Sequence, residues 1–159
     1  MARPRRLDCF SYIGLARYFL TFCTYNRQDI FRDAAVVECT IKQFRDVASR
    51  ESFAVLAYCL MPDHAHLLVE ALQETSNLRR FAKLAKQHSG ATYAQIWRGR
   101  QWQEGYYDRV LREDEDAKRV ARYILNNPVR AALVSTPVEY PYLGSDVWTL
   151  QELLESIVL

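Results

Sequence analysis

The run MPDHAHLLVE, residues 61–70, places two histidines one residue apart, directly after a proline and an aspartate. The run has strand character, and side chains at positions i and i+2 of a strand point to the same face. His64 and His66 therefore point together, while Ala65 points away. Two imidazoles directed at one place are suited to binding a metal ion, although ordinary packing or hydrogen bonding of the two rings would also satisfy the pattern.

The segment RVARYILNNPVRAALV carries a second set of polar groups at helical spacing. Tyr123 and Asn127 are four residues apart, so they lie on one face of a helix. The carboxamide oxygen of Asn127 could join the histidines around a hard cation. The Tyr123 phenol could then attack a phosphoryl group that the cation polarises. The apolar side of this helix, which would grip a sheet, consists of Val120, Ile124 and Leu125.

Positive charge is concentrated in one part of the chain. No acidic residue occurs from Thr75 to Gln103. Within that stretch, Arg79, Lys83 and Lys86 follow the i, i+4, i+7 spacing of one helix face. Exposed aromatic residues beside basic side chains suit stacking with single-stranded nucleic acid, whereas the alternative is a solvated helix face with its aromatics in the core. The interleaved aromatic residues are Phe81, Tyr93, Trp97 and Trp102.

The N-terminus is also basic, with Arg3, Arg5 and Arg6 close together. These side chains could form an arm that contacts DNA phosphates. A disordered, solubilising end is an equally good interpretation.

The elements that must position these residues follow from periodicity and end signals. In chain order we predict a strand over 17–24, a helix capped by Asp33, and strands over 52–60 and 64–72 joined by a tight turn. A helix over 76–97 follows, capped by Ser76 or Asn77, with a break near Ser89 and Gly90. The last predicted elements are a strand within 102–112 and a helix from 113 that Pro128 closes.

This order predicts an α+β protein with the ferredoxin-like βαββαβ plan. We expect an antiparallel four-stranded sheet with helices on one face, the histidine strand at its centre, and an added C-terminal helix that carries the tyrosine. The predicted organisation is a basic arm over 1–15, a main domain over 16–134, and a tail over 135–159 that packs on the domain.

The composition is that of an ordinary single domain. The chain has 159 residues, and 50% of them are hydrophobic, which suffices for a packed core. The net charge of +2 is too small by itself to imply a polyanionic partner. The four cysteines, Cys9, Cys23, Cys39 and Cys59, have no zinc-site spacing and indicate reduced thiols. Without a membrane span or signal peptide pattern, a cytoplasmic protein is expected.

Together, these motifs resemble the single-tyrosine HUH transposases, most closely the REP-associated tyrosine transposase branch. Four stretches carry the resemblance in the same order: ARYFLTFCTYNRQDIF, YCLMPDHAHLLVE, WQEGYYDRVLR and YILNNPVRAALV. They extend over most of the chain, from about residue 3 to 134.

The resemblance implies a reaction and a role for each site residue. His64, His66 and Asn127 would bind Mg²⁺ or Mn²⁺, and Tyr123 would attack a scissile phosphate of single-stranded hairpin DNA to give a 5′-phosphotyrosine. Asp63 occupies a variable position, so a role beside the metal or the substrate stays open for it. The protein would act as a monomer or a homodimer.

Two other classes remain open on the sequence. A domesticated protein could bind structured single strands without turnover. A metal-dependent phosphodiester hydrolase could cut and release free products without forming a covalent adduct.

Overall fold

The strand with the paired histidines lies at the centre of an antiparallel sheet in the computed structural model, which describes residues 10–155. The sheet order is β4-β1-β3-β2-β5. The strands are β1 (Arg17–Cys23), β2 (Phe53–Met61), β3 (His64–Ala71), β4 (Tyr107–Val110) and β5 (Leu143–Gly144). Arg3, Arg5 and Arg6 of the predicted arm lie outside the described residues.

Helices complete the predicted βαββαβ order and extend it. The helices are α1 (Ala34–Glu51), α2 (Leu78–Trp97), α3 (Ala117–Leu125), α4 (Asn127–Arg130) and α5 (Leu150–Glu155). Asp33 caps α1 by accepting a hydrogen bond from the Ala35 amide, and Asn77 caps α2 through the Arg80 amide, so both predicted caps form. Tyr123 lies on α3, the helix that follows the βαββαβ unit.

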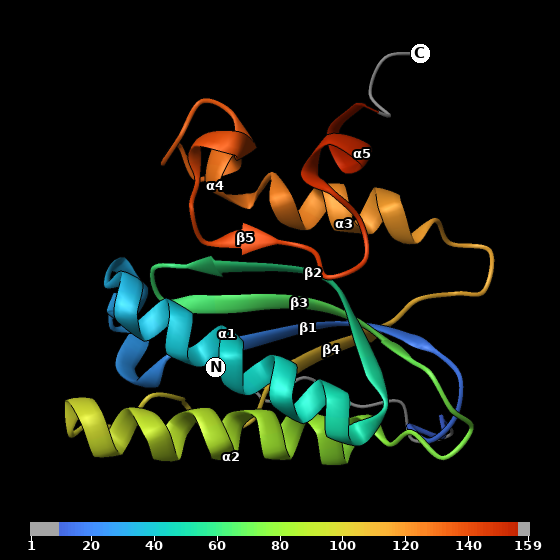
Figure 1. Ribbon diagram of the computed structural model, residues 1–159, viewed down its shortest axis with the longest axis horizontal. Coiled ribbons are helices and arrows are strands. Elements are labelled where there is room, and N and C mark those ends of the chain that lie inside the picture. The colour runs from blue at the N-terminus through green and yellow to red at the C-terminus, as the bar shows by residue number, and fades with distance from the viewer. Residues whose placement is uncertain (1–9, 156–159) are drawn as a thin grey trace.

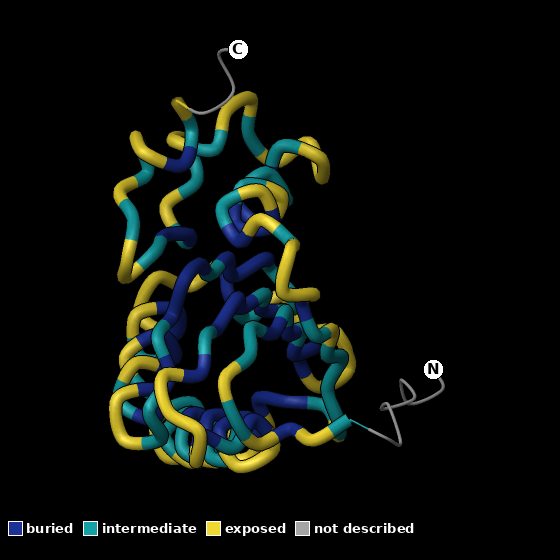
Figure 2. The backbone as a smooth tube through the Cα atoms, turned by 90° about the vertical axis from the view of Figure 1, so that its right-hand side faces the viewer, coloured by how far each residue is buried: buried dark blue, intermediate teal, exposed yellow. Residues whose placement is uncertain are grey.

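Helices cover both faces of the sheet, which corrects the prediction of a single covered face. Helices α1 and α2 pack on one face, and α3 packs on the other (Figure 1). The strand β3 shows the alternation clearly, since Leu67 and Val69 belong to the core beneath α1 and α2, whereas Leu68 belongs to the core beneath α3. His64 and His66 share the face of Leu68, so they point toward the α3 side. Figure 2 shows the buried positions gathered between these layers.

The predicted break in the long helix is absent, because both residues of the suspected break are fixed by contacts. The Ser89 hydroxyl donates to the Ala85 carbonyl of the preceding turn and accepts from the Trp102 indole N–H, at 2.6 and 2.9 Å. Gly90 faces the same indole, where a Cβ atom would lie 3.5 Å from Trp102 Cδ1. Helix α2 therefore continues to Trp97.

Pro128 opens a helix instead of closing one. Helix α3 already ends at Leu125, and Pro128 lies in the first turn of α4. A proline is tolerated there because the first amides of a helix have no intrahelical acceptor. As a result, Tyr123 and Asn127 lie on two successive short helices and not on one.

The segment after residue 134 contacts the sheet and α1. The Tyr140 hydroxyl donates to the Leu60 carbonyl at 2.6 Å, Asp146 pairs with Arg45 at 2.7 Å, and β5 adds a fifth strand beside β2. This strand was not predicted. Among residues 10–155, no helix combines the length and apolar character needed to cross a membrane.

Candidate active site

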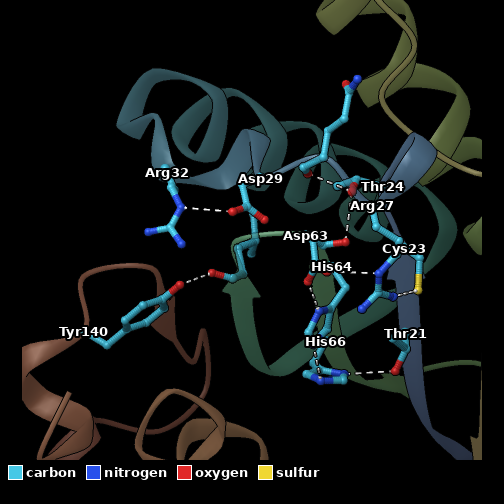
Figure 3. A network of polar contacts seen from close by, with 12 residues as sticks. Thr21, Cys23, Thr24, Arg27, Asp29, Arg32, Asp63, His64, His66 and Tyr140 are labelled. Carbon is cyan, nitrogen blue, oxygen red and sulfur yellow. Dashed lines mark hydrogen bonds and ion pairs between the residues drawn. The ribbon is translucent and has the colours of Figure 1, made fainter. Parts of the chain in front are cut away.

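The two imidazoles of β3 meet edge to face. Their ring centroids are 4.6 Å apart with an interplanar angle of 78°. The Nε2 atoms of His64 and His66 are 3.1 Å apart, so both rings point these nitrogens at one place (Figure 3). The convergence predicted from the H-x-H spacing is present.

The outer nitrogens of the rings have hydrogen-bond partners of their own. His64 Nδ1 lies 2.7 Å from Asp63 Oδ1, and His66 Nδ1 lies 2.9 Å from Thr21 Oγ1. When each Nδ1 carries the proton and donates it to that oxygen, both Nε2 atoms present lone pairs to the shared place. Two facing lone pairs repel, so this place favours a cation or a bridging proton.

Asp63 is itself held by an arginine on the loop after β1. Arg27 Nε lies 3.0 Å from Asp63 Oδ2, and its Nη1 donates to Cys23 Sγ at 2.8 Å. Asn26 and Arg27 both have left-handed backbone angles, with φ of 53° and 54°. Burial opposes ionisation of Asp63, but the hydrogen bond from His64 and the Arg27 charge outweigh it and lower the pKa of this carboxyl.

His66 stays neutral at physiological pH. Burial lowers its pKa to about 3, and the charges of His64, Arg130 and Arg27 act in the same direction. The neutral imidazole is the form that binds metal ions.

The geometry of the pair fits two ligands of one divalent ion. Two neighbouring ligands of an octahedral ion lie about 3.0 Å apart when each bond is about 2.1 Å long, close to the 3.1 Å between the Nε2 atoms. Within residues 10–155, no three His, Cys, Asp or Glu side chains gather into a metal site. Any remaining ligands would therefore come from a carboxamide, from water or from substrate oxygens.

Tyr123 lies on the side of α3 that faces away from the core. Val120 and Ile124 are buried against the sheet, whereas Tyr123 is 57% exposed. Tyr123 and Phe19 line one groove of about 640 Å³. The Phe19 ring centroid is 5.4 Å from that of His66, so the groove leads from the tyrosine toward the imidazole pair.

The Asn127 carboxamide has its partners on its own segment. Its Nδ2 donates to the Ile124 carbonyl at 3.1 Å, and its Oδ1 accepts from Arg130 at 3.0 Å. Arg130 also donates to the Tyr123 carbonyl at 2.8 Å, which links Tyr123 to Asn127. The structure therefore joins these two residues, but Asn127 makes no hydrogen bond to either histidine.

Arg27 pairs with Asp63 beside His64, and Arg130 contacts Tyr123 and Asn127, but neither arginine was identified from the sequence. The signals available were weak, since Arg130 follows Asn127 by one helical turn and Arg27 follows a strand end. Their contacts depend on a left-handed loop and on the break between α3 and α4.

The predicted basic face of α2 is divided in the structure. Arg79 and Lys83 are exposed, and the Arg79 guanidinium lies 4.9 Å from the Tyr12 ring. Lys86 is half-buried and donates to the Gln103 and Gly105 carbonyls, at 2.8 and 2.5 Å. Burial, followed by the charge of Arg100, lowers its pKa to about 8.

A basic groove of about 1050 Å³ runs between α2 and residues 98–106. Its basic lining residues are Lys83, Lys86, Arg98 and Arg100. Of the interleaved aromatics, Phe81 and Trp102 are buried in the core, whereas Tyr93 and Trp97 stack on each other at 5.4 Å and are half-buried. The stacking surface open to a ligand is therefore smaller than the sequence suggested.

The central strand with the imidazole pair and the tyrosine helix on the same sheet face lie within the region that matches a transposase family. The chain belongs to the IS200-like transposase family, whose model matches residues 13–127. The matched region contains the sheet strands β1 to β4, both histidines, Tyr123 and Asn127.

Individual relatives agree with this assignment. A Haemophilus influenzae protein named as a REP-associated tyrosine transposase is 26% identical over 136 residues, covering 79% of this chain and 77% of the relative. A REP-associated tyrosine transposase solved with a REP hairpin shares the fold, with a TM-score of 0.73, 18% identity, and coverage of 90% of this chain and 82% of that one. A transposase structure from Deinococcus radiodurans has a TM-score of 0.54 and 25% identity, covering 79% and 97%.

Proposed function

We propose that the protein nicks hairpin-forming single-stranded DNA and transfers the cut strand through a 5′-phosphotyrosine on Tyr123, with Mg²⁺ or Mn²⁺ as cofactor. The observation that carries this proposal is the Nε2 pair of His64 and His66, 3.1 Å apart on the sheet face that α3 covers. The solved relative bound to a REP hairpin supports hairpin DNA as the substrate class.

In the proposed step, Tyr123 Oη attacks the scissile phosphorus. An O–P bond forms to Tyr123, the bond from phosphorus to the 3′ oxygen breaks, and the phenol proton is released as the 3′ oxygen becomes a hydroxyl. When bound by His64, His66 and the Asn127 oxygen, the divalent ion would polarise the phosphate. Attack by a 3′-hydroxyl on the phosphotyrosine reverses the step and joins strands.

The hairpin would also be held by basic residues outside this site, on α2, which packs on the opposite face of the sheet, and on the N-terminal arm. Arg79, Lys83 and Lys86 are the proposed contacts on α2, and Arg3, Arg5 and Arg6 are the proposed contacts of the N-terminal arm. Contacts of this kind act on phosphates and weaken with added salt.

The test is a covalent-adduct assay with the full chain. A labelled hairpin from the DNA flanking the gene is incubated with the protein and Mg²⁺ or Mn²⁺, and the products are separated in SDS. We expect an adduct that is lost in Tyr123→Phe and His64→Ala but kept in His88→Ala, a control on α2. Free products without an adduct would indicate a hydrolase, and binding without cleavage would indicate a DNA-binding protein.

A further inference from the structure

Arg130 contacts both Tyr123 and Asn127, the two residues of the proposed reaction that follow strand β4 in the sequence. Its Nη2 donates to the Tyr123 carbonyl at 2.8 Å and to Asn127 Oδ1 at 3.0 Å. Its Cζ lies 3.9 Å from the centroid of the Tyr123 ring. One planar guanidinium thus contacts the backbone and ring of the tyrosine together with the carboxamide of the asparagine.

The local backbone explains why such a contact matters. Helix α3 ends at Leu125 and α4 begins at Asn127, so Tyr123 and Asn127 do not share a continuous helix. Tyr123 is 57% exposed, and within residues 10–155 its hydroxyl has no hydrogen-bond partner. An exposed phenol without a partner samples several rotamers, whereas stacking with a guanidinium selects one of them.

The tyrosine segment is held on the same sheet face as the imidazole pair, because Ile124 and Leu125 pack in one core with Leu68 of β3. Arg130 therefore contacts groups that lie on the histidine side of the sheet. A lysine would supply the charge, but its ammonium cannot lie flat on a ring while donating to two oxygens in a fixed plane.

We propose that Arg130 is a positioning residue for strand cleavage, which holds the Tyr123 ring and the Asn127 carboxamide as one unit beside the imidazole pair. This role presupposes the tyrosine-dependent nicking proposed above. Arg130 takes no part in bond making, and its effect is exerted through the orientation of the other two side chains.

The test separates hairpin binding from cleavage. The dissociation constant of the hairpin is measured without metal, and the adduct rate is measured at saturating hairpin and Mg²⁺. In Arg130→Ala we expect a rate lower by roughly 10- to 100-fold, as for a misplaced reacting group, with nearly unchanged hairpin affinity. Methylguanidine in solution should restore part of that rate, and Arg130→Lys should remain slower than the wild type.

The control is Arg50→Ala, which removes an exposed arginine in the last turn of α1, on the other face of the sheet. A wild-type rate in Arg130→Ala, or a loss of affinity with an unchanged rate at saturation, would overturn the positioning role. If thermal unfolding shows that Arg130→Ala does not fold, the rate of Arg130→Lys decides in the same way. An adduct that persists in Tyr123→Phe would instead remove the proposed function itself.

Discussion

Each imidazole on β3 directs one nitrogen at a hydrogen-bond partner and the other at the shared place. Asp63 and Thr21 supply these partners, at 2.7 and 2.9 Å. Such partners fix the tautomer and ring orientation of a ligating histidine and raise its affinity for metal. Asp63, whose role the sequence left open, is therefore proposed to orient His64.

Replacing Asp63 by asparagine tests this orientation. Asp63→Asn keeps the size of the side chain but removes the charge that faces His64 Nδ1. We expect the Mg²⁺ or Mn²⁺ concentration for half-maximal adduct formation to rise by about tenfold or more, as when other residues that hydrogen-bond to a metal ligand are replaced. The control is Asp29→Asn, which alters an exposed carboxylate paired with Arg32 at 3.2 Å. An unchanged metal requirement in Asp63→Asn would show that His64 is oriented without the charge.

Among the individual site residues, the sequence predicts the relative positions of those that lie at regular spacing on one strand or helix. The convergence of His64 and His66 follows from the i, i+2 geometry of a strand. Arg27 and Arg130 could not be predicted, because each reaches the site from an irregular backbone: a left-handed turn for Arg27 and a helix break for Arg130.

Helix α3 holds Tyr123 through an apolar side and a cap. Asp116 caps the helix by accepting from the Lys118 amide at 2.9 Å. The buried side consists of Ala117, Val120, Ala121, Ile124 and Leu125. The helix has 9 residues, so its first turn contributes strongly to its order.

Removal of this cap should affect stability and cleavage together. We expect Asp116→Ala to lower the free energy of unfolding by about 1 kcal/mol and to slow adduct formation, because the segment with Tyr123 is less ordered. Asp33→Ala removes the equivalent cap of α1 and should cost a similar free energy without slowing the adduct. Urea unfolding and the adduct assay measure the two effects, and equal adduct rates in both variants would contradict the argument.

Helices α1, α2 and α3 and the first four strands were predictable because each carries its own periodicity and end signals, whereas the separate helix α4 was not predicted. Strand β5 was not, because its two residues form a strand only by pairing with β2. The continuity of α2 also depended on a distant residue, since Ser89 and Gly90 both contact Trp102. Local sequence gives no sign of either contact.

At the scale of the whole molecule, α2 and residues 98–103 form a basic surface, because no acidic residue occurs between Thr75 and Gln103. If this surface holds hairpin phosphates, Lys83→Gln and Arg79→Gln should each weaken hairpin binding and reduce the slope of log K against log salt by about 1. Arg50→Gln, on the exposed end of α1, should leave the slope unchanged. Titrations at several salt concentrations measure the slopes, and three identical slopes would place the DNA elsewhere.

Lys86 makes the stability of the protein depend on pH in the alkaline range. Its pKa in the folded protein is about 8, lowered from 10.5. Between these values the unfolded chain binds more protons than the folded one, so the Lys86 contribution to stability increases as pH rises through this window. The free energy of unfolding should therefore increase more between pH 8 and 10 in the wild type than in Lys86→Met. Parallel changes in the two proteins would refute the shifted pKa.

The alternation along β3 ties the chemistry to correct folding. A slip of this strand by one residue would turn every side chain to the opposite face, moving Leu67 to the α3 side and the imidazoles into the core beneath α1 and α2. A chain with this register would lose its core packing and would not fold stably. A variant that still unfolds cooperatively has therefore kept the register of β3, and a loss of activity in it has a cause other than a slipped strand.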